Sequence, residues 1–101
     1  MIVYNVTINI EPAVEQDWLI WMKTEHIPRV METGFFLNNR MLRLLNEQPD
    51  ATGTTYAIQY TAADIGKLEE YLEKEAPRLQ QESLQAFPNK FVAFRTFLEE
   101  V

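Results

Sequence analysis

Residues 2–10 alternate strictly, and this alternation constrains the fold of the chain more than any other feature. The even positions carry isoleucine, tyrosine or valine, whereas three of the four odd positions between them carry asparagine or threonine. A period of two with β-branched residues is typical of a strand that buries one face. Residues 54–62 alternate in the same way. We therefore expect two strands that present their apolar faces to one common core.

A helix is expected between these strands, over residues 13–26. At about 100° per residue, its apolar side chains fall within roughly a quarter-turn. They are Val14, Trp18, Trp21 and Met22. Pro28 should break or kink the helix, because the residue before a proline disfavours the helical conformation. A short second helix over residues 28–33 would then end at Gly34, a residue suited to the left-handed position after a helix.

The second half of the chain repeats this organisation. Residues 35–46 are predicted to form a strand, whose imperfect alternation suggests a bulge or burial on both faces. Asp64 is a suitable N-cap for a helix that Pro77 should kink. The apolar stripe expected for this helix consists of Ile65, Leu68, Leu72, Ala76 and Leu79. Residues 91–98 form the last expected strand.

This element order is the split βαβ, ferredoxin-like arrangement of an α+β protein. We expect residues 1–101 to form one domain, with a four-stranded antiparallel sheet and two kinked helices on one face. Small polar residues should occupy the middle of the other face, with apolar residues on its outer strands. Such a patch marks an interface, so we predict a homodimer with two sheets packed face to face. An open, solvated sheet is the alternative.

The composition argues against several classes of function. The net charge is −6 and the pI is near 4.7, which opposes binding to nucleic acid and attachment to anionic membranes. The chain has no cysteine and one histidine, which excludes disulfides, thiolate nucleophiles and Cys-ligated metals. We expect neither a metal nor a cofactor. Neither a signal peptide nor a transmembrane segment is predicted, and a cytoplasmic location is expected because the absence of cysteine fits a reducing compartment.

The whole chain resembles a small bacterial family of unknown function. The matching segments are residues 1–7, 18–22, 25–28, 33–34, 40–45, 55–57, 76–77 and 91–95. In addition, His26-Ile27-Pro28 resembles the His-x-Pro of EthD-like proteins. That group of dimeric α/β barrels also includes antibiotic-biosynthesis monooxygenases and muconolactone-isomerase-like enzymes. The resemblance implies this fold and a dimer, and it implies no particular activity.

His26 and Glu25 are the candidate catalytic residues. The ordinary pKa of histidine lies near neutrality, so His26 can serve as a general acid or base. Alternatively, it caps the helix end and favours its negative pole. Glu25 lies near the centre of the apolar stripe, and a buried carboxylate beside a histidine would form an acid–base pair. The alternative is that Glu25 reaches solvent where the helix frays.

Six further residues are candidates for a ligand pocket. They are Trp18, Trp21, Met22, Tyr4, Tyr56 and Tyr60. Tyrosine hydroxyls that meet His26 inside an apolar cavity would make a small-ligand site. The tryptophans are also explained as the stripe that packs against the sheet. Three strand arginines, Arg40, Arg43 and Arg95, require a carboxylate of the protein or an anionic ligand.

Two functional hypotheses follow from these observations. The first is a small dimeric protein that binds an apolar or aromatic molecule between sheet and helices, with cofactor-free acid–base or oxygen chemistry as its possible reaction. The second is a non-catalytic regulatory or protein-interaction module, in which the tryptophans are packed solid and the dimer surface is the function. A cavity above ~300 Å³, the lower range of ligand sites, would favour the first hypothesis.

Overall fold

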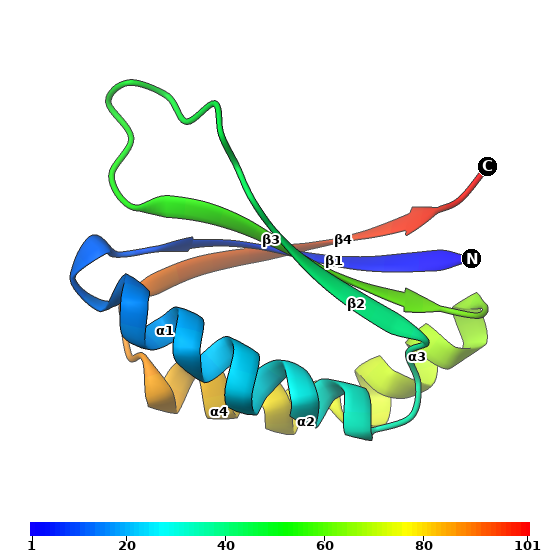
Figure 1. The fold of residues 1–101 in the computed structure, drawn as a ribbon. Coiled ribbons are helices and arrows are strands. Elements are labelled where there is room, and N and C mark those ends of the chain that lie inside the picture. Colours follow the sequence, from blue (N-terminus) through cyan, green and yellow to red (C-terminus); the bar gives the residue numbers. More distant parts are fainter.

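The computed structural model describes residues 1–101 and contains one four-stranded antiparallel sheet (Figure 1). Its strands are β1 (Ile2–Ile10), β2 (Asn38–Arg43), β3 (Thr54–Ala62) and β4 (Phe91–Glu99). The order across the sheet is β2-β3-β1-β4, so the two strictly alternating strands are central. Every neighbouring pair is antiparallel. The α+β architecture and the split βαβ topology predicted from the sequence are therefore confirmed.

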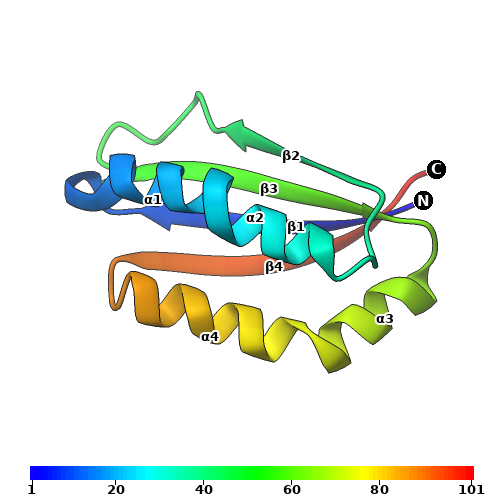
Figure 2. The ribbon, with the colours of Figure 1, turned by 60° about the horizontal axis from the view of Figure 1, so that its bottom comes forward.

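Two helical crossings cover one face of the sheet (Figure 2). The first crossing consists of the 3₁₀ turn η1 (Pro12–Val14), α1 (Glu15–Trp21), the π-helical turn η2 (Met22–His26) and α2 (Ile27–Glu32). The second crossing consists of α3 (Ile65–Lys74) and α4 (Ala76–Ala86). None of these helices combines the length and the apolar character that spanning a membrane would need.

The predicted helix ends are present, and one of the two predicted interruptions is. The Asp64 carboxylate caps α3 by accepting a hydrogen bond of 2.9 Å from the backbone N–H of Lys67. Gly34 follows the first crossing with a φ of 82°, the left-handed conformation expected after a helix. The second crossing is interrupted before Pro77, where Glu75 has a φ of −120°. In the first crossing Ile27 keeps helical angles (φ −59°, ψ −45°), so the expected break at Pro28 is absent and the irregularity is the π-helical turn before it.

The register of the central strands explains why the core lies on one face of the sheet. Tyr4 stands opposite Tyr60, and Val6 stands opposite Ile58, so the apolar faces of β1 and β3 point to the same side. None of the 18 buried residues is charged. The helices cover the apolar face of the sheet, and the Trp18 residue of α1 is only 1% exposed. Burial of this apolar surface supplies the main stabilisation of the fold.

The second strand is shorter than predicted, because β2 covers Asn38–Arg43 and not residues 35–46. Phe36 precedes the strand and is buried, with its ring centroid 5.2 Å from that of Tyr60 and 4.7 Å from that of Tyr71. The chain therefore passes through the core before it pairs with β3. This passage accounts for the imperfect alternation of the segment.

The open face of the sheet has a polar centre and apolar edges, as expected. In the centre, Asn5 donates to Thr96 at 3.1 Å and accepts from Gln59 at 3.3 Å. The edges carry exposed apolar side chains on β4 and along β2, namely Val92, Phe94, Leu98, Leu42 and Leu44. In this structure of one chain, these edge residues are accessible to a partner.

Candidate functional site

A cavity of about 250 Å³ lies between the sheet and the two helical crossings. Fourteen of the 18 residues that line it are hydrophobic, and none is acidic. They are Tyr4, Val6, Ile8, Trp18, Met22, His26, Val30, Ile58, Tyr60, Tyr71, Leu79, Gln80, Ser83, Leu84, Phe91, Val92, Ala93 and Arg95. The volume is just below the ~300 Å³ at which ligand sites usually begin, but an apolar cavity of about 150 Å³ already holds benzene. There is therefore room for one substituted aromatic ring.

The π-helical turn determines which side chains of the first crossing face this cavity. The N–H of Ile27 bonds to the carbonyl of Met22, five residues back, so the turn holds one residue more than an α-helical turn. In an uninterrupted α-helix, the buried stripe would continue from Met22 to Glu25 and Arg29. The extra residue turns those two side chains outward, where they are 48% and 42% exposed. It brings His26 to the cavity wall instead.

Both crossings hold His26 in place. The imidazole stacks on Trp21, with ring centroids 5.0 Å apart and an angle of 20° between the planes. Its Nδ1 atom lies 3.5 Å from the Oγ atom of Ser83 on α4. The same Oγ atom lies 3.4 Å from the carbonyl oxygen of Leu79, one turn earlier. These contacts position the ring without a carboxylate partner.

The surroundings of His26 keep its imidazole neutral. Burial lowers the pKa of His26 to about 4, because removal from water disfavours the charged ring. The nearby Glu82 carboxylate opposes this change, whereas the positive charges of Arg29 and Arg95 add to it. At pH 7 the site therefore contains a neutral imidazole, with one ring nitrogen that carries a free lone pair.

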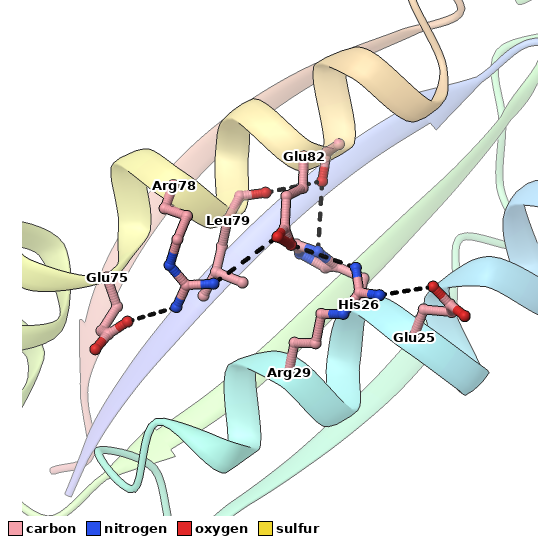
Figure 3. A network of polar contacts seen from close by, with 8 residues as sticks. Glu25, His26, Arg29, Glu75, Arg78, Leu79 and Glu82 are labelled. Carbon is pink, nitrogen blue, oxygen red and sulfur yellow. Dashed lines mark hydrogen bonds and ion pairs between the residues drawn. The ribbon is translucent and has the colours of Figure 1, made fainter.

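A network of ion pairs joins the two crossings beside His26 (Figure 3). Arg29 pairs with Glu25 at 2.9 Å and with Glu82 at 3.4 Å, and Arg78 pairs with Glu75 at 2.7 Å and with Glu82 at 3.8 Å. The Glu82 carboxylate is thus shared by two guanidinium groups. Although acidic residues gather here, no group of three or more His, Cys, Asp or Glu side chains is arranged to hold a metal ion.

A second polar contact lies at the β4 side of the cavity. The Nε–H of Arg95 donates to the hydroxyl of Tyr4 at 3.1 Å. The Tyr4 ring packs against Tyr60 and Tyr71, with centroid distances of 6.1 and 5.7 Å. Burial raises the pKa of both Tyr60 and Tyr71, so their phenols stay protonated. The cavity therefore combines a neutral imidazole, neutral phenols and one guanidinium group.

Five of the eight residues predicted for the site line the cavity. They are His26, Trp18, Met22, Tyr4 and Tyr60. Trp21 does not line it, but packs against His26 and Phe87. Glu25 is exposed and paired with Arg29, so the structure brings no carboxylate of Glu25 to the cavity. The predicted acid–base pair of Glu25 and His26 is therefore not formed in the structure. The physical reason is the π-helical turn, which directs Glu25 to solvent.

Tyr56 also lies away from the cavity. It points to the helix-covered side of the sheet, but its hydroxyl donates to the Glu15 carboxylate of α1 at 2.5 Å. Thr54 donates to the same carboxylate at 3.2 Å. Burial and the hydrogen bond to Glu15 raise the pKa of Tyr56 to about 12. Its position and contacts make Tyr56 a link between β3 and α1.

Sequence reasoning missed the residues that the second crossing contributes. Tyr71 lies three residues after Leu68, on the buried side of α3, so helical spacing was an available signal. Ser83 gave no comparable signal, because its place at the cavity depends on how α4 continues beyond Pro77. Arg95, on β4, was predicted to need a carboxylate of the protein or an anionic ligand, and its approach to Tyr4 follows from the pairing of β4 with β1.

Several solved structures have the same fold. An EthD family protein from Bacillus halodurans is 12% identical, with a TM-score of 0.67 and 100% of both chains covered. SnoaB, a cofactor-independent oxygenase from Streptomyces nogalater, is 10% identical, with a TM-score of 0.62, and 99% of this chain and 92% of that chain are covered. A dimeric ferredoxin-like protein from an uncultured marine organism is 21% identical, with a TM-score of 0.59, and the coverage is 99% and 97%. These likenesses confirm the predicted ferredoxin-like fold.

The family of the chain follows from its sequence. No curated protein matches it. A family model, however, matches the chain from its first residue to its last, in agreement with the predicted resemblance to a family of unknown function. Over residues 1–101 the chain belongs to the DUF4286 family, a domain of unknown function.

Proposed function

We propose that this protein binds a small apolar or aromatic molecule in the cavity between sheet and helices. The observation that carries the proposal is the neutral imidazole of His26 at the wall of an apolar cavity of about 250 Å³. A mostly apolar pocket with a few convergent polar groups is the usual form of a ligand site. Trp18, Met22, Tyr4 and Tyr60 would contact the body of the ligand, and His26 its polar group.

We propose that Ser83 selects one tautomer of His26. When the Ser83 hydroxyl donates to the carbonyl of Leu79, its oxygen is left to accept the Nδ1–H of His26. The lone pair then lies on Nε2, which can take a proton from a bound ligand while the electron pair stays on the ligand. The low pKa makes this imidazole a weak base, so the proposal rests on binding and not on the rate of a reaction.

Such proton transfer needs no cofactor. SnoaB, which has this fold, is a cofactor-independent oxygenase, and this likeness supports the cofactor-free part of the proposal. Glu25 has no role in it, because its carboxylate is exposed and paired with Arg29. His26 is therefore the one candidate catalytic residue that we retain.

We also propose that two copies associate through their open sheet faces. The exposed apolar residues at the edges of that face support this assembly, and they are Val92, Phe94, Leu98, Leu42 and Leu44. A homodimer pairs the same patch of both copies around a twofold axis. One structure with the same fold is a dimeric ferredoxin-like protein, which gives further support.

Ligand binding can be tested by thermal unfolding in the presence of single-ring aromatic compounds. A ligand at 100 times its Kd stabilises the folded state by about 2.7 kcal/mol, and the unfolding temperature of a domain of this size should then rise by roughly 10 °C or more. His26→Ala should fold and lose this rise, whereas the neighbouring Glu25→Ala should retain it. An unchanged response of His26→Ala would remove His26 from the site.

The open sheet face also favours a second candidate function, a non-catalytic interaction module. Val92 and Phe94 are 70% and 63% exposed, which is unusual for large apolar side chains on one surface. This function requires no ligand in the cavity. It would be preferred if no aromatic compound raised the unfolding temperature while the dimer was present.

A further inference from the structure

The cavity has an unbalanced charge. In a chain with a net charge of −6, no acidic residue lines the cavity, and Arg95 is its only cationic side chain. None of the six ion pairs of the chain includes Arg95. Its hydrogen bond to Tyr4 uses the Nε–H, which is one of five N–H donors on a guanidinium group. The donors on the two terminal nitrogens therefore remain for an anion.

The chain offers Arg95 no carboxylate of its own. The Glu82 carboxylate is close enough to raise the pKa of His26. It already pairs with Arg29 at 3.4 Å and with Arg78 at 3.8 Å. Arg95 stands opposite Val6 in the sheet register, on the helix side of β4, and the residue is exposed to solvent. A guanidinium group at the edge of an apolar cavity, without an acidic partner, is suited to bind a carboxylate through two parallel hydrogen bonds.

We propose that the ligand of this cavity is a single-ring aromatic carboxylate, whose carboxylate binds Arg95 and whose ring fills the apolar space. This inference rests on the proposed function, because it specifies the class of ligand for the same cavity. The volume of about 250 Å³ sets the size of the ring system, since about 150 Å³ is enough for benzene. The Arg95–Tyr4 hydrogen bond fixes the guanidinium at the place where the anionic end would lie.

Binding of such an anion also acts on His26. The charge of Arg95 contributes to the low pKa of His26. A carboxylate on Arg95 offsets this positive charge, so the pKa of His26 rises when the anionic ligand binds. A neutral ligand of the same shape leaves the charge in place. The difference between the pKa of His26 with the anionic ligand and with the neutral ligand therefore reports the charge of the ligand.

Phenylacetate and phenylacetamide provide a matched pair of probes, because they differ in charge and hardly in shape. Their dissociation constants are to be measured by calorimetry on the full chain, on Arg95→Met and on Lys67→Met. Lys67 is a suitable control, since its side chain is exposed, forms no ion pair and lies outside the cavity. We expect the wild-type protein and Lys67→Met to bind phenylacetate on the order of tenfold more tightly than phenylacetamide. Arg95→Met should bind both compounds alike.

The outcomes separate this inference from the proposed function. Equal affinities for the two probes in the wild-type protein, unchanged in Arg95→Met, would overturn the inference and leave ligand binding intact. If neither probe binds the wild-type protein, the proposed function fails together with it. As a second readout, the NMR pKa of His26 should be higher with saturating phenylacetate than with saturating phenylacetamide, because both exclude water and only the first offsets the charge of Arg95. Circular dichroism melts of Arg95→Met check that the variant is folded.

Discussion

The hydroxyl oxygen of Ser83 lies 3.5 Å from the Nδ1 atom of His26, and this contact joins the two helical crossings at the cavity wall. The π-helical turn brings His26 to this position, and α4 brings Ser83, which follows 57 residues later in the chain. The polar part of the cavity thus depends on two segments that are far apart in sequence. Substitutions on either segment test whether both are needed to hold His26 in place.

The first prediction concerns the pH dependence of stability. The pKa of His26 falls from an ordinary value of 6.5 to about 4 on folding. Between these values the unfolded chain binds a proton that the folded chain does not, so the free energy of unfolding decreases as pH falls from 6.5 to 4. Above pH 6.5 this contribution is fully present. The total loss is at most about 3 kcal/mol.

His26→Gln should abolish this part of the pH dependence, since glutamine does not titrate. Urea unfolding of both proteins between pH 4 and pH 7 gives the difference directly. Because the chain has a single histidine, its NMR titration is free of overlap and should report a pKa near 4. A value near 6.5 would show that the imidazole is in contact with water.

The second prediction concerns the tautomer of His26. In the wild-type protein the proton should lie on Nδ1, since Ser83 accepts it while donating to the carbonyl of Leu79. The ¹⁵N chemical shifts of the imidazole distinguish the two tautomers. Ser83→Ala should shift the population towards the Nε2–H form, with a loss of stability of about 1 kcal/mol. Identical ¹⁵N shifts in the two proteins would mean that Ser83 does not control the tautomer.

The third prediction separates the two tryptophans. Trp18 is 1% exposed and packs on Tyr56 with a centroid distance of 5.1 Å. Trp18→Ala should therefore cost about 3–5 kcal/mol, as large-to-small core substitutions do. Trp21 is only partly buried, and Trp21→Ala should cost clearly less while it exposes His26 and raises its pKa. Equal losses of stability in the two variants would contradict this assignment.

The fourth prediction concerns the open sheet face. Light scattering at micromolar concentration should report a dimer for the wild-type protein. Phe94→Glu places a charge among the exposed apolar residues of β4, so it should produce a monomer. Ile20→Glu is the matched control, because Ile20 is 61% exposed on α1, away from the sheet. A monomeric wild-type protein, or a dimer that Phe94→Glu leaves intact, would exclude this interface.

Much of the fold was predictable because its signals are local. The alternation of β1 and β3 was sufficient to define the two central strands, since each buries one face over its full length. Pro77 marked the interruption of the second crossing, because proline lacks the N–H that an uninterrupted helix requires. Asp64 marked the start of α3 for the equally local reason that its side chain caps the first turn.

The site was less predictable because it depends on contacts between distant segments. Helical periodicity placed Glu25 on the buried stripe, but the additional residue in the π-helical turn turned it to solvent and brought His26 inward. The spacing of apolar residues does not reveal where a helix contains the additional residue of a π-helical turn. Tyr56 was correctly assigned to the helix-covered face, yet its hydroxyl donates to Glu15, and neither residue lines the cavity. Ser83 was found only through the packing of α4.

Ligand binding in the cavity is the central claim, and methyl NMR during a titration with benzyl alcohol, phenol and phenylacetate tests it most directly. Met22 and Leu79 line the cavity, whereas Leu42 lies outside it on the open sheet face. We predict saturable shifts of the Met22 and Leu79 methyl signals, no shift at Leu42, and a weaker affinity in His26→Ala. Saturable shifts at Leu42 alone, or no saturable shift with any of the three compounds, would contradict the claim.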